Sequence, residues 1–203
     1  PDLTTSSSPA LADLAGNTLG SVSSSTVVEK DGANPVIDLN KGLNLVSFPI
    51  SSTDTQTVSD VLDESKTNEV WKYVDSEWKV WTPEKADNSG FSFDIRSGEG
   101  YIVNSSQSYT STPEIDELQS TAPRQVDLVE GWNLVGHYDE SSESISTALD
   151  NTIGSSSYNQ VWKNTGTGSI NYADTAGNFQ SGEGYWVQTK GDLSDGTVVY
   201  GAN

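Results

Sequence analysis

Short runs in which apolar and polar residues alternate predict β-strands along most of the chain from residue 36 onward. In the first half, the predicted strands cover residues 43–48, 70–74, 78–81, 91–95 and 101–103. The second and third of these form a predicted hairpin, because the stretch 75–77 between them has the composition of a turn. The apolar pattern therefore indicates a fold built mostly from short strands.

A short helix interrupts the strand pattern once in each half of the chain. Thr57 stands three residues before Asp60, which is the spacing of a capping box with Asp in place of Glu. The apolar positions with helical spacing are Val58, Val61 and Leu62 in the first half, and Ile145, Ala148 and Leu149 in the second.

Four blocks of sequence occur twice, in the same order. Residues 37–46 match 126–135, 58–62 match 145–149, 70–72 match 161–163, and 97–103 match 181–187. The offset between the copies drifts, as loop insertions would produce. The repeat predicts a mostly β fold of two tandem β-rich modules with the same topology, each containing one short helix.

The repeat also sets the expected domain boundaries. Residues 36–104 are the first module and 125–203 the second, which ends in a closing strand after the Asp195-Gly196 turn. Residues 105–124 form a linker with room for one extended strand. Residues 1–35 are rich in Ser, Thr, Ala and Gly and are expected to form an extended N-terminal arm. Either residues 26–28 of this arm pair with another strand, in the same chain or in the next copy, or the arm is a flexible tether.

The amino-acid composition argues against several classes of function. The chain has 29 acidic and 10 basic residues, a net charge of −19, which disfavours binding to nucleic acid or anionic membranes. No apolar stretch is long enough to span a membrane, and no Cys exists for disulfides, thiolate zinc sites or Cys nucleophiles. Scattered acid with few Lys and abundant Ser, Thr and Gly is typical of halophilic archaea. We therefore expect an extracellular protein that works in high salt.

Three landmarks carry a family resemblance. They are Gly131-Trp132-Asn133-Leu134-Val135, Val70-Trp71-Lys72-Tyr73 and Gly182-Glu183-Gly184-Tyr185-Trp186-Val187. These segments resemble a module of secreted and surface proteins of bacteria and archaea, and the resemblance covers residues 36–104 and 125–188. It implies stalks, adhesins, surface layers or appendages, and it carries no catalytic residues. The chain departs from the pattern with Leu43 and Ile102 where Trp is usual, and with Gly136-His137 where Ser-x-Pro is usual.

The sequence contains no convincing set of catalytic residues. His137 is the only histidine, so a Ser–His relay or a histidine metal cluster could not be built without it, and a packing or surface role is favoured. Glu99 and Glu183 recur in the Ser-Gly-Glu-Gly segments, which indicates a turn whose glycines supply positive φ. We expect the protein not to be an enzyme.

Cation binding is a weaker hypothesis than a solvated acidic surface. The candidate ligands are Asp60, Asp63, Asp192 and Asp195, for structural Ca²⁺ or monovalent cations, but none of them has the spacing of an EF-hand loop. No other cofactor is expected.

The remaining candidate site residues are Trp78, Trp81 and Asn104. Trp71 and Trp162 recur, as do Tyr101 and Tyr185, which predicts core positions for them together with Leu45 and Leu134. Trp78 and Trp81 do not recur and are the candidates for a binding surface, although packing is the favoured interpretation for them too. Asn104 begins an N-glycosylation sequon.

Two functions follow as hypotheses. The first is a non-catalytic, self-associating structural subunit of an extracellular haloarchaeal assembly: an appendage or filament, a surface layer or a virion coat. The second is a glycan- or receptor-binding adhesin module of a larger surface protein. The expected partners are other copies of the chain, other surface proteins or glycans.

Overall fold

The structure is a computed structural model. It describes residues 35–50, 56–74, 77–85, 93–113, 124–137, 142–164, 170–173, 177–191 and 197–200. All of these belong to one compact unit, 32–203. The predicted N-terminal arm up to residue 34, with its candidate strand at 26–28, lies outside the described residues.

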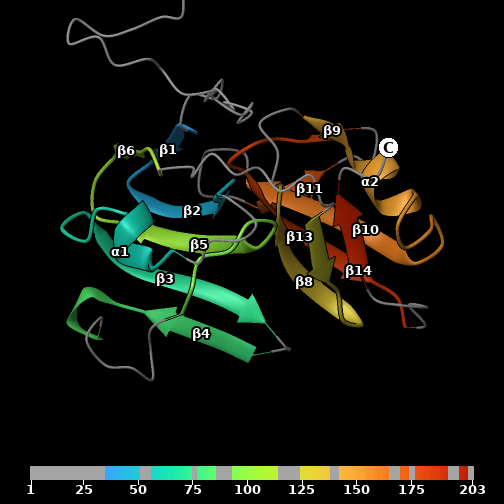
Figure 1. Cartoon of the computed structure of the whole chain (residues 1–203), viewed down its shortest axis with the longest axis horizontal. Helices are drawn as coiled ribbons and strands as arrows, with labels where there is room; N and C mark the ends of the chain where they lie inside the picture. The colour runs from blue at the N-terminus through green and yellow to red at the C-terminus, as the bar shows by residue number, and fades with distance from the viewer. Residues whose placement is uncertain are drawn as a thin grey trace, which may run out of the picture. The chain divides into compact units, whose positions relative to one another are not determined.

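The first half of the described chain forms one four-stranded antiparallel sheet and one strand pair (Figure 1). Its elements are β1 (Ile37–Leu39), β2 (Gly42–Ser47), α1 (Val58–Val61), β3 (Thr67–Val74), β4 (Glu77–Trp81), the 3₁₀ helix η1 (Pro83–Lys85), β5 (Gly100–Ser105) and β6 (Tyr109–Ser111). The sheet has the order β2-β5-β3-β4, and β1 pairs with β6.

The second half forms a sheet with the same order of equivalent strands. Its elements are β7 (Arg124–Asp127), β8 (Gly131–Gly136), β9 (Glu143–Ser144), α2 (Ile145–Asp150), β10 (Tyr158–Asn164), β11 (Ile170–Ala173), β12 (Asn178–Phe179), β13 (Gly184–Thr189) and β14 (Thr197–Tyr200). The sheet order is β8-β13-β10-β11, and β7 pairs with β14 as β1 does with β6. The mostly β class is confirmed. We call the halves, 36–111 and 124–200, module 1 and module 2.

The Gly-x-Asn motif at the start of β2 and β8 closes a turn in each module. Gly42 and Gly131 both have a φ of +98°, which favours glycine over any residue with a Cβ. Two residues later, the Asn44 side chain accepts from the Asn40 N–H and donates to the Asn40 carbonyl, both at 2.8 Å. Asn133 makes the same pair of bonds with Val129. The recurrence of this motif therefore has a structural cause.

The predicted capping box begins α1. The Thr57 N–H and hydroxyl both donate to Oδ2 of Asp60, at 2.8 and 2.7 Å, and these bonds lower the pKa of the Asp60 carboxyl. In module 2 the Ser144 hydroxyl accepts from the Thr147 N–H at the start of α2. Both short helices thus begin where the sequence predicts.

Each module has its own apolar core. The predicted core residues Leu45, Leu134, Tyr101 and Tyr185 are buried. The prediction for Trp71 and Trp162 is wrong: both are only half-buried, and the neighbours Val70 and Val161 are the fully buried residues. Side chains alternate between the two faces of a strand, so when Val70 and Val161 face the core, the adjacent Trp71 and Trp162 face away from it.

Two expected strand boundaries also differ. The described part of the strand predicted at 91–95 makes only a single bridge, from Ile95 to Gln56. Glu77, expected in the hairpin turn, is the first residue of β4 and pairs with Val74. The expected linker 105–124 had room for one extended strand, and β6 is such a strand; it pairs with β1.

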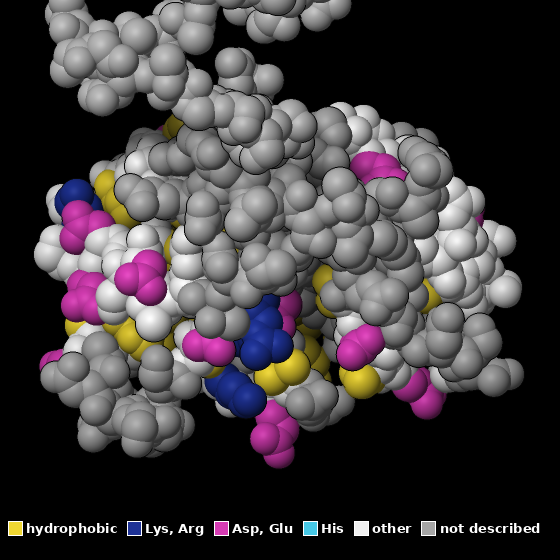
Figure 2. All heavy atoms as spheres, viewed as in Figure 1, with side chains coloured by type: hydrophobic (Ala, Val, Ile, Leu, Met, Phe, Trp, Pro, Cys, Tyr) yellow, Lys and Arg dark blue, Asp and Glu magenta, His cyan; other side chains and the backbone are white. Residues whose placement is uncertain are grey.

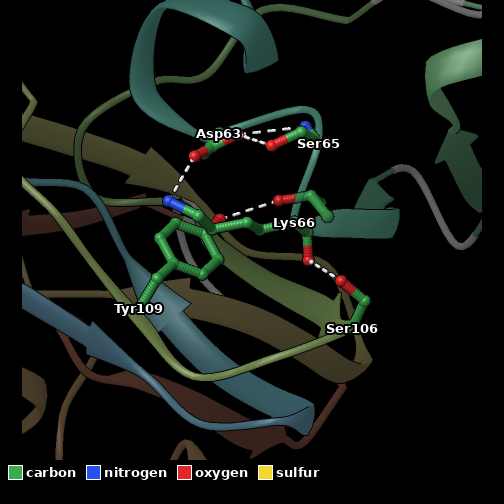
Figure 3. Close-up of polar contacts among 6 residues, drawn as sticks. Asp63, Ser65, Lys66, Ser106 and Tyr109 are labelled. Carbon is green, nitrogen blue, oxygen red and sulfur yellow. Dashed lines mark hydrogen bonds and ion pairs between the residues drawn. The ribbon is translucent and has the colours of Figure 1, made fainter.

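A polar latch joins the turn after α1 to the segment that enters β6 (Figure 3). Lys66 lies 2.5 Å from Asp63 and 5.3 Å from the centre of the Tyr109 ring. Its backbone carbonyl accepts from the N–H and the hydroxyl of Ser106. Lys66 and Ser65 lower the pKa of the Asp63 carboxyl. This latch holds the last strand of module 1 against the body of the module.

Candidate functional site: an aromatic face at the module junction

The two modules meet through equivalent backbone positions. The N–H of Ser47 donates to the Gly182 carbonyl at 3.0 Å, and the N–H of Gly136 donates to the Gly98 carbonyl at 2.7 Å. Ser47 and Gly136 end the equivalent strands β2 and β8, and the two acceptors belong to the two Ser-Gly-Glu-Gly segments. Each module thus gives the other the same bond that it receives, so the junction has approximate two-fold symmetry.

The two glycines of each Ser-Gly-Glu-Gly segment have different roles. Gly98 and Gly182 have φ values of +83° and +79°, as the predicted turn requires. The second glycine allows close approach to the other module. A Cβ on Gly100 would lie 2.6 Å from the Val135 carbonyl oxygen, and one on Gly184 would lie 2.7 Å from the Val46 carbonyl oxygen. The prediction of a turn was therefore incomplete.

The glutamate between these glycines is held in both modules. Glu99 Oε2 accepts from the Tyr101 hydroxyl at 2.6 Å and lies 2.5 Å from Lys72 Nζ. Glu183 Oε2 accepts from Tyr185 at 2.7 Å and lies 3.6 Å from Lys163 Nζ. The same contacts of Glu, Tyr and Lys occur in both modules. We therefore assign them the structural role of holding the turn, and do not assign them to a binding site.

The buried Tyr101 makes stability depend on alkaline pH. Burial, then the neighbouring Glu99 carboxylate, raises the pKa of Tyr101 well above its usual 10.0. The folded pKa exceeds the unfolded one, so this contribution to stability is complete below about pH 10 and is lost as pH rises above it. We expect the free energy of unfolding to fall above about pH 10, and to fall less steeply in Tyr101→Phe. Urea unfolding of both chains from pH 8 to 12 measures this, and equal slopes would contradict it.

A cleft of about 300 Å³ lies where the end of β3 meets module 2. Module 1 lines it with Lys72, Tyr73 and Arg96, and module 2 lines it with Asp127 and Trp132. The two-fold equivalent position holds a smaller cleft of about 190 Å³, lined by residues such as Asp38 and Glu183. The fold therefore provides two related clefts at the junction, and only the larger one has aromatic walls.

Four aromatic side chains from both modules lie together beside the larger cleft; we call them the aromatic face. Their ring centres are 5.0 Å apart for Tyr73–Trp78, 5.5 Å for Tyr73–Trp186, 5.8 Å for Trp78–Trp186 and 6.3 Å for Trp132–Trp186. These spacings are within the range of stabilising aromatic pairs. Trp78 is 50% exposed and Trp132 38% exposed, so the cluster opens to solvent.

The equivalent positions on the other side of the junction carry no aromatic residues. In the repeat, Trp132 corresponds to Leu43 and Trp186 corresponds to Ile102. Tyr73 corresponds to Asn164. Trp78 corresponds to Ile170, because Trp78 pairs with Tyr73 across its hairpin as Ile170 pairs with Asn164. The fold does not need aromatic rings at these positions, because it forms both modules with only one set of them. The aromatic face is therefore a specialised feature of one of two equivalent surfaces.

Of the two tryptophans predicted to form a binding surface, only Trp78 lies on this face. Trp81 is 1% exposed and belongs to the core of module 1, so it cannot contact a ligand. The two residues are three positions apart on β4, and the alternation of side chains places them on opposite faces.

The other candidate residues lie away from the aromatic face or outside the described residues. The carboxylates of Asp60 and Asp63 accept from groups of Thr57 and Ser65, and Asp192 and Asp195 are not described. Within the described ranges, no three His, Asp or Glu side chains come together as a metal site would require. Asn104 lies in the central strand β5, where its amide donates to Glu69.

His137 is a packing residue. It is fully buried and stacks on Phe179, with ring centres 6.2 Å apart and planes 19° apart. Its backbone carbonyl accepts from the Ser47 hydroxyl of module 1 at 3.1 Å. The favoured interpretation of this residue agrees with its position.

Sequence reasoning did not single out Tyr73, Trp132 and Trp186 as members of a binding surface. The signal was present, because none of the three has an aromatic counterpart in the other module.

Comparison with models of protein families, with curated proteins and with solved structures finds no match. Among the described helices, none has the length and apolar character to cross a membrane.

Proposed function

We propose that the chain is a non-catalytic, glycan-binding module of an extracellular surface protein, and that the aromatic face is its binding site. The observation that carries the proposal is the asymmetry of the junction. Two equivalent surfaces exist, and only one carries Tyr73, Trp78, Trp132 and Trp186. Packing alone does not account for aromatic rings that the equivalent surface lacks.

Aromatic rings at the surface suit the apolar faces of sugar rings. A pyranose presents C–H groups on its faces and hydroxyls around its rim, so it stacks on Trp or Tyr while its hydroxyls stay free for hydrogen bonds. Trp78 and Trp132 expose enough area to serve as such platforms. Contiguous exposed apolar area of this kind marks binding surfaces on soluble proteins.

The adjoining cleft supplies the polar groups that a sugar also needs. The cleft is lined by the Arg96 guanidinium, which carries N–H donors, and by the Asp127 carboxylate, both beside Trp132. A cleft of about 300 Å³ is at the lower limit of small-molecule sites. This size suits one or two sugar units at the end or on the side of a longer glycan.

The repeat provides a matched control for the binding test. Trp132→Ala removes one wall of the proposed site, whereas Leu43→Ala truncates the exposed residue at the equivalent position of module 1. We expect glycans retained by the native chain on an array in molar salt to bind Trp132→Ala about 10–100-fold more weakly. Leu43→Ala should bind as the native chain does.

Two results of this array would contradict the proposal. One is that the native chain retains no glycan at any salt concentration tested. The other is that Trp132→Ala and a Trp78→Ala chain retain the same glycans with native affinity. Tryptophan fluorescence and the unfolding midpoint, measured on each variant, show whether a loss of binding comes with a loss of folding.

A self-associating structural subunit is the second candidate function, and the two-fold junction favours it. The surfaces that join the modules are self-complementary, which is the property that symmetric assemblies use between copies. Self-association and glycan binding are compatible, because the aromatic face opens to solvent while the junction is formed.

The acidic surface predicts that stability depends on salt. Figure 2 shows Asp and Glu side chains scattered over the described part of one face, among few Lys or Arg. With a net charge of −19, unscreened repulsion disfavours the compact state in dilute buffer. We expect the melting temperature to rise from dilute buffer to molar KCl or NaCl. A melting temperature indifferent to both salts would remove the argument for a halophilic source.

A further inference from the structure

The backbone contacts that the described residues make at the junction between the modules are reciprocal. Besides the two backbone hydrogen bonds, Val46 bridges Glu183 as Glu99 bridges Val135. Leu45 lies against the position of Gly184 as Leu134 lies against that of Gly100. Leu45 and Leu134 are buried, at 6% and 5% exposure, yet they belong to neither module's core cluster. They are buried at the junction.

We propose that the junction is exchangeable, and that module 1 of one copy of the chain pairs with module 2 of a second copy through these same contacts. The partner is a second copy because each surface already fits the equivalent surface of its own repeat. A reciprocal exchange gives a closed two-fold dimer, and continued exchange gives a linear polymer.

The energetics set the conditions for exchange. The exchanged junction contains the same hydrogen bonds and glycine contacts as the intramolecular one, so the contact free energies nearly cancel. What differs is concentration. A short connection between two partners gives an effective concentration on the order of millimolar, and a second chain competes when its own concentration approaches that value. Exchange also requires the junction to open, so the forms interconvert slowly once made.

The test uses the full chain. It is unfolded in urea, refolded into molar salt at about millimolar and at about micromolar concentration, and diluted immediately for size-exclusion chromatography with light scattering. We expect dimers and larger species only from the concentrated sample, and we expect them to persist after dilution. A chain that returns only as monomer from the concentrated sample would overturn the proposal.

A glycine substitution shows whether the dimers use the junction. A Cβ on Gly136 would lie 2.2 Å from Ser47 Cβ and 2.5 Å from the Glu99 carbonyl oxygen, so Gly136→Val blocks the junction within a chain and between chains alike. We expect no refolding dimer from this variant. Gly191→Ala is the control, because its Cβ would meet only the mobile end of the Glu130 side chain. Equal dimer yields from Gly136→Val and the native chain would overturn the proposal.

Ser47→Ala gives a second measurement if Gly136→Val does not fold. Loss of the hydroxyl removes its bond to the His137 carbonyl from the closed and exchanged forms equally. We expect the equilibrium fraction of dimer to stay the same and the rate of exchange to rise several-fold, because opening becomes easier. An unchanged rate would show that opening of this junction is not the step that leads to the dimer.

Discussion

Trp81→Ala should lower the free energy of unfolding by about 3–5 kcal/mol, which is the usual cost of truncating a buried Trp. Trp81 is 1% exposed and packs in the core of module 1, where it lies across the hairpin from Val70. Truncation removes the transfer free energy of the ring and leaves a cavity, because the sheet and α1 hold the surrounding residues in place. Urea unfolding in molar salt measures the change.

Trp78→Ala is the matched control, since it removes the same side chain from the same strand. Trp78 is 50% exposed and contacts Tyr73 and Trp186. The loss of these ring contacts should cost about 1 kcal/mol. If Trp81→Ala were no more destabilising than Trp78→Ala, the Trp81 ring would not be part of the core.

These two tryptophans show what alternation along a strand can and cannot predict. The sequence places them three positions apart in one strand, so they must lie on opposite faces. The assignment of both to one binding surface was therefore inconsistent with the predicted strand itself. Which face points to the core depends on where α1 packs, and periodicity within β4 does not contain that information.

Recurrence between the modules predicted the core only in part. Tyr101 and Tyr185 recur and are fully buried, but Trp71 and Trp162 recur and are half-buried on the other face of the sheet. Trp162 there donates its indole N–H to Gln160. A duplicated fold preserves surface and junction contacts as well as cores, so recurrence identifies structural roles without identifying burial.

The site could be predicted less well than the fold, because it is formed between modules. Nothing in the sequence of module 1 brings Tyr73 within 5.5 Å of Trp186, which is more than a hundred residues away. That approach depends on how the modules meet, and so on the absence of a Cβ at Gly100 and Gly184. The sequence showed these glycines as turn residues, since a close approach between distant segments leaves the same pattern.

Gly136→Val should separate the two modules without unfolding either of them. Gly136 ends β8, where it pairs with Gly184 of β13, and its φ is not in the left-handed region. Valine is well suited to such an extended position within module 2, so any cost arises at the junction. There the added Cβ would lie 2.2 Å from Ser47 Cβ and 2.5 Å from the backbone carbonyl oxygen of Glu99, neither of which can move away by a side-chain rotation.

We expect Gly136→Val to lower the free energy of unfolding by about 3 kcal/mol, which is the upper part of the range for overpacking. The value is high because the substitution also strains the hydrogen bond from the Gly136 N–H to the Gly98 carbonyl. The loss should also change cooperativity. Modules that share a junction unfold together, and modules without one unfold as separate units. We expect calorimetry in molar salt to show one transition for the native chain and for Gly191→Ala, and two transitions for Gly136→Val. A single transition at the native temperature in Gly136→Val would mean that this contact does not couple the modules.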